Sequence, residues 1–344
     1  VGTFTSEGGE GIYLCNFNPE TGDIVLAKTF KGIDNPSFLK ISPDGRYLYA
    51  ATRAAAVIET SGGYVSAYRI GSGGELIFLN KQVSNGQEPC HVDVSPDGRL
   101  VAVATYGSGT TSLYPVNPDG SLEPATSVIQ NEGQGLNLQR QLSPHAHSIK
   151  FSPDGKQAFS ADLGTDQLNI FNIDGKQLLP AGQKFVKFTP GAGPRHFVFH
   201  PADEVIYVIH ELNSTISVVK NEANEWKTIQ NISTLPAGYS GESFCADIHI
   251  LPGEKFLYGS NRGDNSVFIA KIDSVTKMLT GLGTVETHGN WPRNFVISPN
   301  GQFMLVANQR SGNITVFKIN HETGFPEFTG KELKIPAPVC LEFL

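Results

Sequence analysis

The chain has few of the features that mark several common classes of protein. It has 344 residues, but only four are cysteine, two are tryptophan and 17% are charged, and its formal net charge is −7. An acidic chain without a basic run is a poor partner for nucleic acid or for an anionic membrane surface, so we predict neither. No stretch approaches the ~20 apolar residues of a membrane-spanning helix.

The cysteines are too far apart to suggest a metal or redox motif. They are Cys15, Cys90, Cys245 and Cys340, and none has C-x-x-C spacing. We therefore expect buried free thiols rather than a disulfide framework. The chain begins at Val1 without a methionine. We favour a cytoplasmic protein, with a periplasmic protein that has lost its leader as the alternative.

Glycine (37 residues) and proline (21 residues) are abundant, which is typical of a turn-rich, all-β protein. Six similar segments can be aligned on a proline, with separations of 53, 57, 48, 51 and 47 residues. The aligned prolines are Pro43, Pro96, Pro153, Pro201, Pro252 and Pro299. A period of about 50 residues over this length predicts about seven repeats, with four-stranded propeller blades as the leading candidate.

Each repeat has the same apolar pattern. Residues four and two before the proline are apolar in every copy, as in Phe197 and Phe199, which indicates one buried face of a strand. An SPDG or SPNG turn follows in four copies, and a second strand such as "RYLYAA" comes next. We predict one all-β domain over residues 1–344, a seven-bladed β-propeller of four-stranded antiparallel blades. The N-terminal "GIYLCNF" and C-terminal "PVCLEFL" segments should pair and close the ring.

Two sets of positions vary in residue type while the apolar positions do not. One set lies six and five residues before the proline, and the other lies nine and ten residues after it. Because neighbouring strands are antiparallel, both sets should meet at one end of the channel and form a concave polar site. The candidates from these positions are His91, Tyr106, His147, Asp162, Arg195, His196, Glu211, Asn261, Arg262 and Arg293.

These residues do not predict a metal site or a cofactor site. The histidines are scattered and lack H-E-x-x-H spacing, and a calcium site would need more clustered carboxylates than the channel offers. Glu211 lies in a loop with few other acids. It is equally suited to be a base or the ion-pair partner of an arginine.

Longer stretches of the sequence resemble a known family. "GPRHFVFHP", "SPHAHSIKFSPDG", "SNRGDNSVFIAKI" and "WPRNFVISPNGQFMLVANQRSGNITVFKI" are similar to the lactonase family of seven-bladed propellers. That family includes 6-phosphogluconolactonases and 3-carboxy-cis,cis-muconate cyclases. The resemblance implies a metal-free site of one histidine, two arginines and one glutamate. These map to His147 or its neighbour His145, to Arg195 and Arg262, and to Glu211.

The resemblance implies hydrolysis of 6-phospho-D-glucono-1,5-lactone to 6-phosphogluconate, a step of the pentose phosphate pathway. The arginines would bind the phosphate and the developing oxyanion, and a histidine or Glu211 would activate water. The residues that we expect around the substrate are Tyr106, His91, His196, Asp162, Asn261 and Arg293. The alternatives are a cyclase that acts on carboxylated dienes and a non-catalytic binding propeller. We expect a monomer or a weak homo-oligomer.

Overall fold

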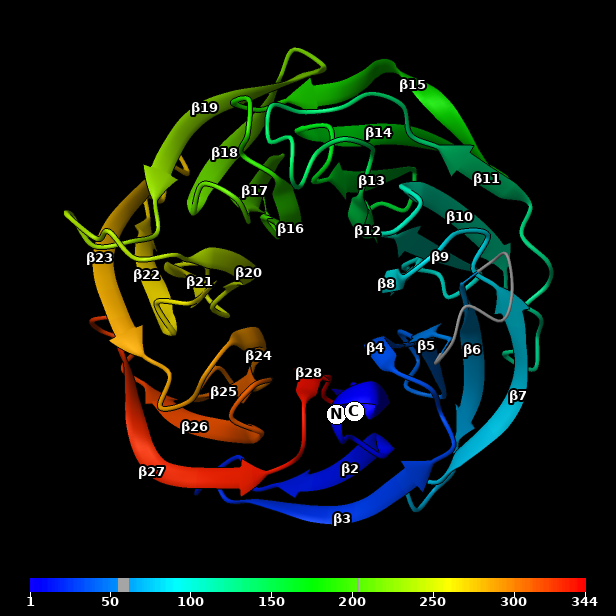
Figure 1. The fold of residues 1–344 in the computed structure, drawn as a ribbon, viewed down its shortest axis with the longest axis horizontal. Coiled ribbons are helices and arrows are strands. Elements are labelled where there is room, and N and C mark those ends of the chain that lie inside the picture. Colours follow the sequence, from blue (N-terminus) through cyan, green and yellow to red (C-terminus); the bar gives the residue numbers. More distant parts are fainter. Residues whose placement is uncertain (55–61, 203) are drawn as a thin grey trace.

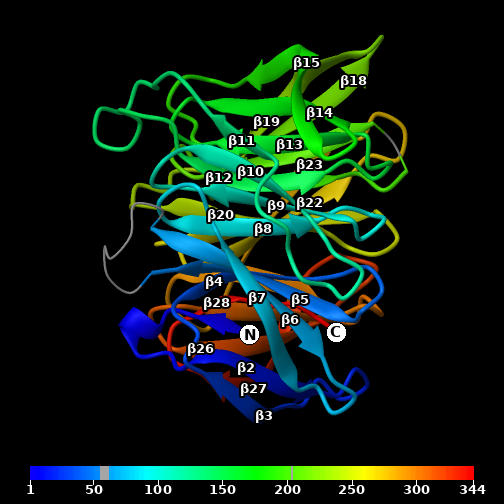
Figure 2. The same ribbon diagram turned by 90° about the vertical axis from the view of Figure 1, so that its right-hand side faces the viewer.

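The computed structural model describes residues 1–54, 62–202 and 204–344. Seven four-stranded antiparallel sheets lie around a central axis and form a β-propeller (Figure 1). Viewed from the side, the turns and loops lie at the two ends of the ring (Figure 2). The described residues include one helix, a single 3₁₀ turn, η1 (Thr5–Glu7). None of their helices is long and apolar enough to cross a bilayer.

Six blades follow the chain order directly, each running from the axis to the rim. The first blade contains β4 (Pro36–Ile41), β5 (Tyr47–Arg53), β6 (Gly63–Ile70) and β7 (Leu76–Val83), and the second β8 (Pro89–Val94), β9 (Leu100–Thr105), β10 (Thr110–Pro115) and β11 (Ser127–Gln130). The third contains β12 (Ala146–Phe151), β13 (Gln157–Asp162), β14 (Gln167–Asp174) and β15 (Gln177–Lys187), and the fourth β16 (Pro194–Phe199), β17 (Val205–His210), β18 (Thr215–Glu222) and β19 (Glu225–Ser233). The fifth contains β20 (Phe244–Ile250), β21 (Phe256–Arg262), β22 (Ser266–Ile272) and β23 (Leu279–Glu286), and the sixth β24 (Pro292–Ile297), β25 (Phe303–Asn308), β26 (Asn313–Ile319) and β27 (Pro326–Lys334).

The seventh blade joins the two ends of the chain. Its order is β28 (Pro338–Cys340), β1 (Gly2–Thr3), β2 (Gly11–Phe17) and β3 (Ile24–Lys31). In the β1–β28 pair, Gly2 is opposite Cys340 and Thr3 is opposite Pro338. Closure of the ring by N- and C-terminal strands is confirmed. The prediction that "GIYLCNF" pairs with the C-terminal segment is wrong, because that segment forms β2 and the short strand β1 lies between it and β28. The β1–β28 pairing leaves no open sheet edge between the first and last blades.

The SPDG repeat forms a tight turn between the first two strands of a blade. In the first blade, Ser42 Oγ donates a hydrogen bond to Asp44 Oδ1 at 2.6 Å and accepts one from Tyr47 N at 2.9 Å. Gly45 has a φ of 72°, a left-handed conformation that glycine adopts at little cost. The same serine and acid or amide contacts recur at Ser95, Ser152 and Ser298.

Hydrophobic side chains pack between neighbouring blades. One cluster joins Phe159 of the third blade to Phe197 and Ile206 of the fourth, and another joins Leu113 of the second blade to Ile149 of the third. Burial between sheets accounts for the repeating apolar positions, because each blade has two faces to cover. The ring is thus held by packing at the blade interfaces, and its inner strands are free to present polar side chains to the axis.

Candidate functional site

A β-bulge lies near the start of the innermost strand in all seven blades. In β16, Pro194 is opposite His210 and His196 is opposite Ile209, so Arg195 is the extra residue. His147 in β12 and Arg293 in β24 occupy the same place. A bulge bends the strand and redirects its side chains. The first set of variable positions therefore consists of the bulged residues of the inner strands and the residues that follow them. The second set lies across from them, at the ends of the second strands.

Glu211 lies at the centre of a cluster of arginines. It follows β17 directly, and its side chain is 6% exposed. Its Oε2 lies 3.1 Å from Arg195 Nε and 2.7 Å from Arg262 Nη2, and its Oε1 lies 2.6 Å from Arg140 Nη2. Arg195 comes from the fourth blade and Arg262 from the fifth, so the two blades bring together residues 67 positions apart.

The charges of this cluster act strongly on one another because they are buried. Burial alone would raise the pKa of Glu211, but Arg262, Arg195 and Arg140 outweigh it and hold that pKa below its ordinary value. Burial and the neighbouring Arg262 lower the pKa of Arg195 to about 10. Both groups are charged at neutral pH. Three guanidiniums around one carboxylate leave two positive charges in excess, which suits an anionic ligand.

Arg140 was not predicted from the sequence. It lies on residues 131–145, the longest connection between consecutive blades in the described parts of the chain. The buried side chain of Gln141 fixes this loop by donating hydrogen bonds to Leu163 O and Asp166 Oδ1, both at 2.7 Å. Arg140 lies outside the repeat, so the two sets of variable positions counted from the repeat prolines do not include it. The only available signal was the length of the loop before "SPHAHS".

Asp162 was predicted as a substrate-binding residue, and the structure places it beneath this loop. Its Oδ2 accepts a hydrogen bond from Asn131 Nδ2 at 2.6 Å, and its Oδ1 accepts one from His145 N at 2.9 Å. The carboxylate therefore connects both ends of the loop to β13. No described contact joins Asp162 to the arginine cluster, so its role here is to position the loop that carries Arg140 and His145.

Several aromatic rings lie side by side near the axis. His147 and His196 have ring centroids 5.5 Å apart, and those of His196 and His91 are 5.4 Å apart. Phe38, another residue absent from the predicted site, stacks on His91 at 4.1 Å. Burial and the positive charge of Arg195 hold the pKa of His147 well below its ordinary value. The neutral imidazole therefore predominates at neutral pH.

The ring of Tyr106 contacts both His145 and His147. The rings of His145 and Tyr106 are stacked at 4.5 Å, and His147 packs edge-on against Tyr106 at 5.5 Å. His145 Nδ1 lies 2.7 Å from Tyr106 O. Because a carbonyl only accepts, Nδ1 is the donor in this contact, and the neutral imidazole would have its lone pair on Nε2.

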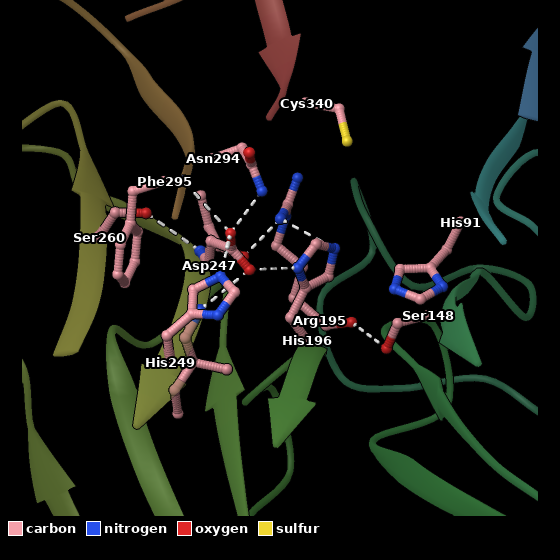
Figure 3. Close-up of polar contacts among 12 residues, drawn as sticks. His91, Ser148, Arg195, His196, Asp247, His249, Ser260, Asn294, Phe295 and Cys340 are labelled. Atoms are coloured by element: carbon pink, nitrogen blue, oxygen red, sulfur yellow. Dashed lines mark hydrogen bonds and ion pairs between the residues drawn. The ribbon is translucent and has the colours of Figure 1, made fainter. Parts of the chain in front are cut away.

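Asp247 organises a second polar network beside the cluster (Figure 3). Its Oδ1 lies 2.8 Å from His196 Nδ1, while its Oδ2 lies 3.0 Å from His249 Nε2 and 2.5 Å from Asn294 Nδ2. His196 Nε2 in turn lies 3.3 Å from Arg195 Nη1. The network spans three blades and reaches the arginine cluster through His196.

Two other predicted residues lie outside the Glu211 cluster. Asn261 is fully buried and hydrogen-bonds to Thr234 and Ser266. Arg293 lies with its guanidinium 5.1 Å from the Phe4 ring centroid and donates to Gln309 Oε1 at 3.4 Å. Burial and the charges of Arg195 and Arg262 lower the pKa of Arg293 well below its ordinary value. It is thus close enough to add positive potential without touching Glu211.

Across residues 1–54, 62–202 and 204–344, no group of three or more histidine, cysteine, aspartate or glutamate side chains has the arrangement of a metal site. The four cysteines are free, and three of them are buried. Burial raises the pKa of Cys90 to about 11 and that of Cys245 to about 12, so both are thiols at neutral pH.

Comparison with known proteins identifies the family of the chain. The model of the family described as "Lactonase, 7-bladed beta-propeller" matches residues 1–343. The chain belongs to this lactonase family. It is 35% identical over 347 residues to the 6-phosphogluconolactonase of Bacillus subtilis, with 100% of the chain and 97% of the relative covered. The 6-phosphogluconolactonase of Formosa agariphila is also 35% identical, over 99% of this chain and 98% of its own.

A solved structure relates this lactonase-family chain to a differently named enzyme. The periplasmic gluconolactonase of Pseudomonas aeruginosa has a TM-score of 0.90 and 30% identity, and the match covers 98% of this chain and 96% of that one. The names of these relatives therefore differ in one respect: two of them specify a phosphorylated lactone and one does not. Which residues of this chain would recognise that group becomes the central question about its site.

Proposed function

We propose that this chain hydrolyses 6-phospho-D-glucono-1,5-lactone to 6-phosphogluconate. The observation that carries the proposal is the buried carboxylate of Glu211 held by three guanidiniums, beside His147, whose imidazole is neutral at physiological pH. Lactone opening needs positive charge at the carbonyl oxygen and a base for the attacking water. The names of the 35% identical relatives support the same reaction.

In this proposal Arg195 and Arg262 stabilise the oxyanion, and Glu211 fixes their positions. Both arginines are almost completely buried, at 2% and 6% side-chain exposure. Main-chain carbonyls hold both guanidiniums in position, because Arg195 Nη1 donates to Ala246 O, and Arg262 Nε and Nη2 donate to Phe244 O and Cys245 O. Arg195 Nη2 and Arg262 Nη1 would then be the donors that face the substrate. Donors held in advance cost little reorganisation when charge develops on the substrate.

Either His147 or His145 would act as the base that accepts a proton from the attacking water. His147 is buried, and its Nδ1 has no hydrogen-bond partner among the described residues. A bound anion beside His147 would raise its lowered pKa and so make it a better proton acceptor. In His145, Nδ1 donates to Tyr106 O, so Nε2 would be the atom that accepts a proton from water. The base is the histidine whose replacement by asparagine abolishes kcat while the other variant retains it.

The direct test is the rate of hydrolysis of freshly generated 6-phosphogluconolactone above its spontaneous opening. A coupled dehydrogenase assay would compare the wild type, Arg195→Ala and Arg195→Lys, each with and without chelator. We expect a chelator-insensitive wild-type rate that is lost in Arg195→Ala and partly kept in Arg195→Lys. Circular dichroism would check that each variant is folded.

Other outcomes would point to a different function. A wild-type rate no higher than the spontaneous one would overturn the proposal. Turnover of a carboxylated muconate with none of the lactone would favour the cyclase alternative. If neither compound is converted, the binding-propeller alternative is favoured, and there His147, Arg195 and Glu211 should tolerate alanine without loss of partner binding.

A further inference from the structure

The three arginines around Glu211 are not equivalent. The side chains of Arg195 and Arg262 are 2% and 6% exposed, whereas that of Arg140 is 34% exposed. Arg195 and Arg262 extend from the sheets and also donate to main-chain carbonyls. The side-chain hydrogen bonds of Arg140 to the described residues go to Glu211 Oε1 and to Tyr106 Oη, which lies 3.2 Å from Nη2. Arg140 thus closes the cluster on its solvent side.

The position of Arg140 is nevertheless well defined. Arg140 N and Gln141 N donate to Asn137 O at 3.1 and 2.7 Å, which forms a tight turn directly before the buried Gln141 anchor. Asp162 holds the two ends of the same loop. A guanidinium presented by an anchored loop can exchange a carboxylate partner for a ligand without a rearrangement of the blades.

The charge of the cluster favours such an exchange. A phosphate monoester carries close to two negative charges at neutral pH, and a guanidinium can bind it with two parallel hydrogen bonds. Glu211 would keep Arg195 and Arg262 as partners if Arg140 turned toward the ligand. The site would then contain a buried pair of arginines for the ester carbonyl and an outer arginine for a distal anionic group.

We propose that Arg140 is the residue that selects a phosphorylated lactone over an unphosphorylated one, by binding the phosphoryl group, with Tyr106 holding the guanidinium in place. This inference rests on the proposed lactonase function and assigns the phosphate to a residue outside the four that family resemblance implies. Charge-assisted hydrogen bonds of this kind are worth about 1.5–3 kcal/mol, or roughly 10- to 150-fold in affinity.

The test measures binding and turnover in parallel. Isothermal titration would give the affinities of the wild type, Arg140→Gln and Arg140→Lys for 6-phosphogluconate and for gluconate. The same proteins would be assayed with 6-phosphogluconolactone and with glucono-1,5-lactone. Glutamine retains a donor toward Glu211 but has no charge, so Arg140→Gln should preserve the inner pair.

We expect Arg140→Gln to weaken 6-phosphogluconate binding and kcat/KM for the phosphorylated lactone by roughly 10- to 100-fold, mainly through KM. The values for gluconate and glucono-1,5-lactone should change less than about threefold. Arg140→Lys should fall between the wild type and Arg140→Gln. The wild type should bind 6-phosphogluconate more tightly than gluconate, and Arg140→Gln should remove most of that preference.

Arg310→Gln is the matched control. Arg310 is exposed at the same end of the ring, with its guanidinium 3.4 Å from the Trp291 ring centroid, and has no described contact with Glu211. Its replacement removes one positive charge near the site and therefore measures general attraction of anions, which added salt should suppress. The preference for 6-phosphogluconate should persist in Arg310→Gln.

The outcomes separate this inference from the proposed function. If Arg140→Gln affects both substrates and both acids equally, or affects none, the inference is wrong while wild-type hydrolysis still supports the lactonase. A loss of preference that Arg310→Gln reproduces also overturns it. If the wild type hydrolyses no lactone but Arg140 still determines the preference between the two acids, the proposed reaction fails and the phosphate site stands. A wild type that binds neither acid overturns the inference.

Discussion

His196 Nδ1 lies 2.8 Å from Asp247 Oδ1, across the interface between the fourth and fifth blades. Burial and the charge of Arg195 lower the pKa of His196 to about 3 despite the opposing effect of Asp247. His196 is therefore neutral, with its proton on Nδ1, and its Nε2 accepts the hydrogen bond from Arg195 Nη1 at 3.3 Å. Asp247 thus acts on Arg195 through the tautomer of His196.

Asp247→Asn should impair turnover more than substrate binding. The amide of asparagine can donate to His196 Nδ1, so the proton of His196 is no longer held on Nδ1 and Nε2 need not remain the acceptor for Arg195. The substitution also removes the buried negative charge that His249 and Asn294 contact. We expect kcat to fall about 10- to 100-fold with a smaller change in KM, as for a group that positions a charge in the transition state. Steady-state kinetics with the phosphorylated lactone measures both values.

A purely structural role of Asp247 would give a different result. His196→Gln can keep a donor toward Asp247 and an acceptor toward Arg195, so it should retain more activity than Asp247→Asn. Equal loss in the two variants, or loss that follows the decrease in Tm, would contradict the positioning role.

The stability of the protein should decrease in acid because of buried histidines. Burial lowers the pKa of His210 to about 3, and its Nε2 lies 2.6 Å from Ser217 Oγ. As the pH falls below the ordinary value of about 6.5, the unfolded chain binds a proton that the folded chain does not, so the free energy of unfolding decreases until about pH 3. The contribution of His210 should reach about 2 kcal/mol by pH 5.

His210→Gln isolates this contribution. Glutamine can still hydrogen-bond to Ser217 but does not titrate. Urea unfolding at pH 7 and pH 5 should show a smaller loss of stability in the variant than in the wild type, by about 2 kcal/mol. An identical pH dependence in the two proteins would show that His210 is not buried in its neutral form.

Closure of the ring requires glycine at position 2. A Cβ on Gly2 would lie 2.5 Å from Pro36 O, and Gly2 pairs with both β2 and β28. Gly2→Ala should therefore destabilise the protein by about 1–3 kcal/mol, because the seventh blade must move away from the first. Thermal and urea unfolding measure the change.

Gly182 provides the matched control for that substitution. A Cβ there would meet no atom within 4 Å. Gly182→Ala should change stability by less than about 1 kcal/mol, and in the favourable direction. If Gly2→Ala were as stable as Gly182→Ala, the close approach of β1 to Pro36 would not be a constraint on ring closure.

The sequence was sufficient to predict the repeat and the end of the ring at which polar residues gather. Alternating apolar residues and SPDG turns are local features, and antiparallel pairing then places Arg195 near His210 and Glu211 whatever the curvature of the blade. The same reasoning predicted Arg262, which pairs with the start of its own inner strand. Local pattern and strand register therefore determined which residues face the site.

Only the tertiary structure decided how those residues are connected. Arg140 reaches Glu211 from a connection with no repeat pattern, and Asp162 is engaged by that loop instead of the arginine cluster. The contact of Asp247 with His196 depends on how two blades pack, as does the stacking of Phe38 on His91. Such contacts join residues from separate blades, and their distances follow from blade curvature and inter-blade packing, which no periodicity along the chain encodes.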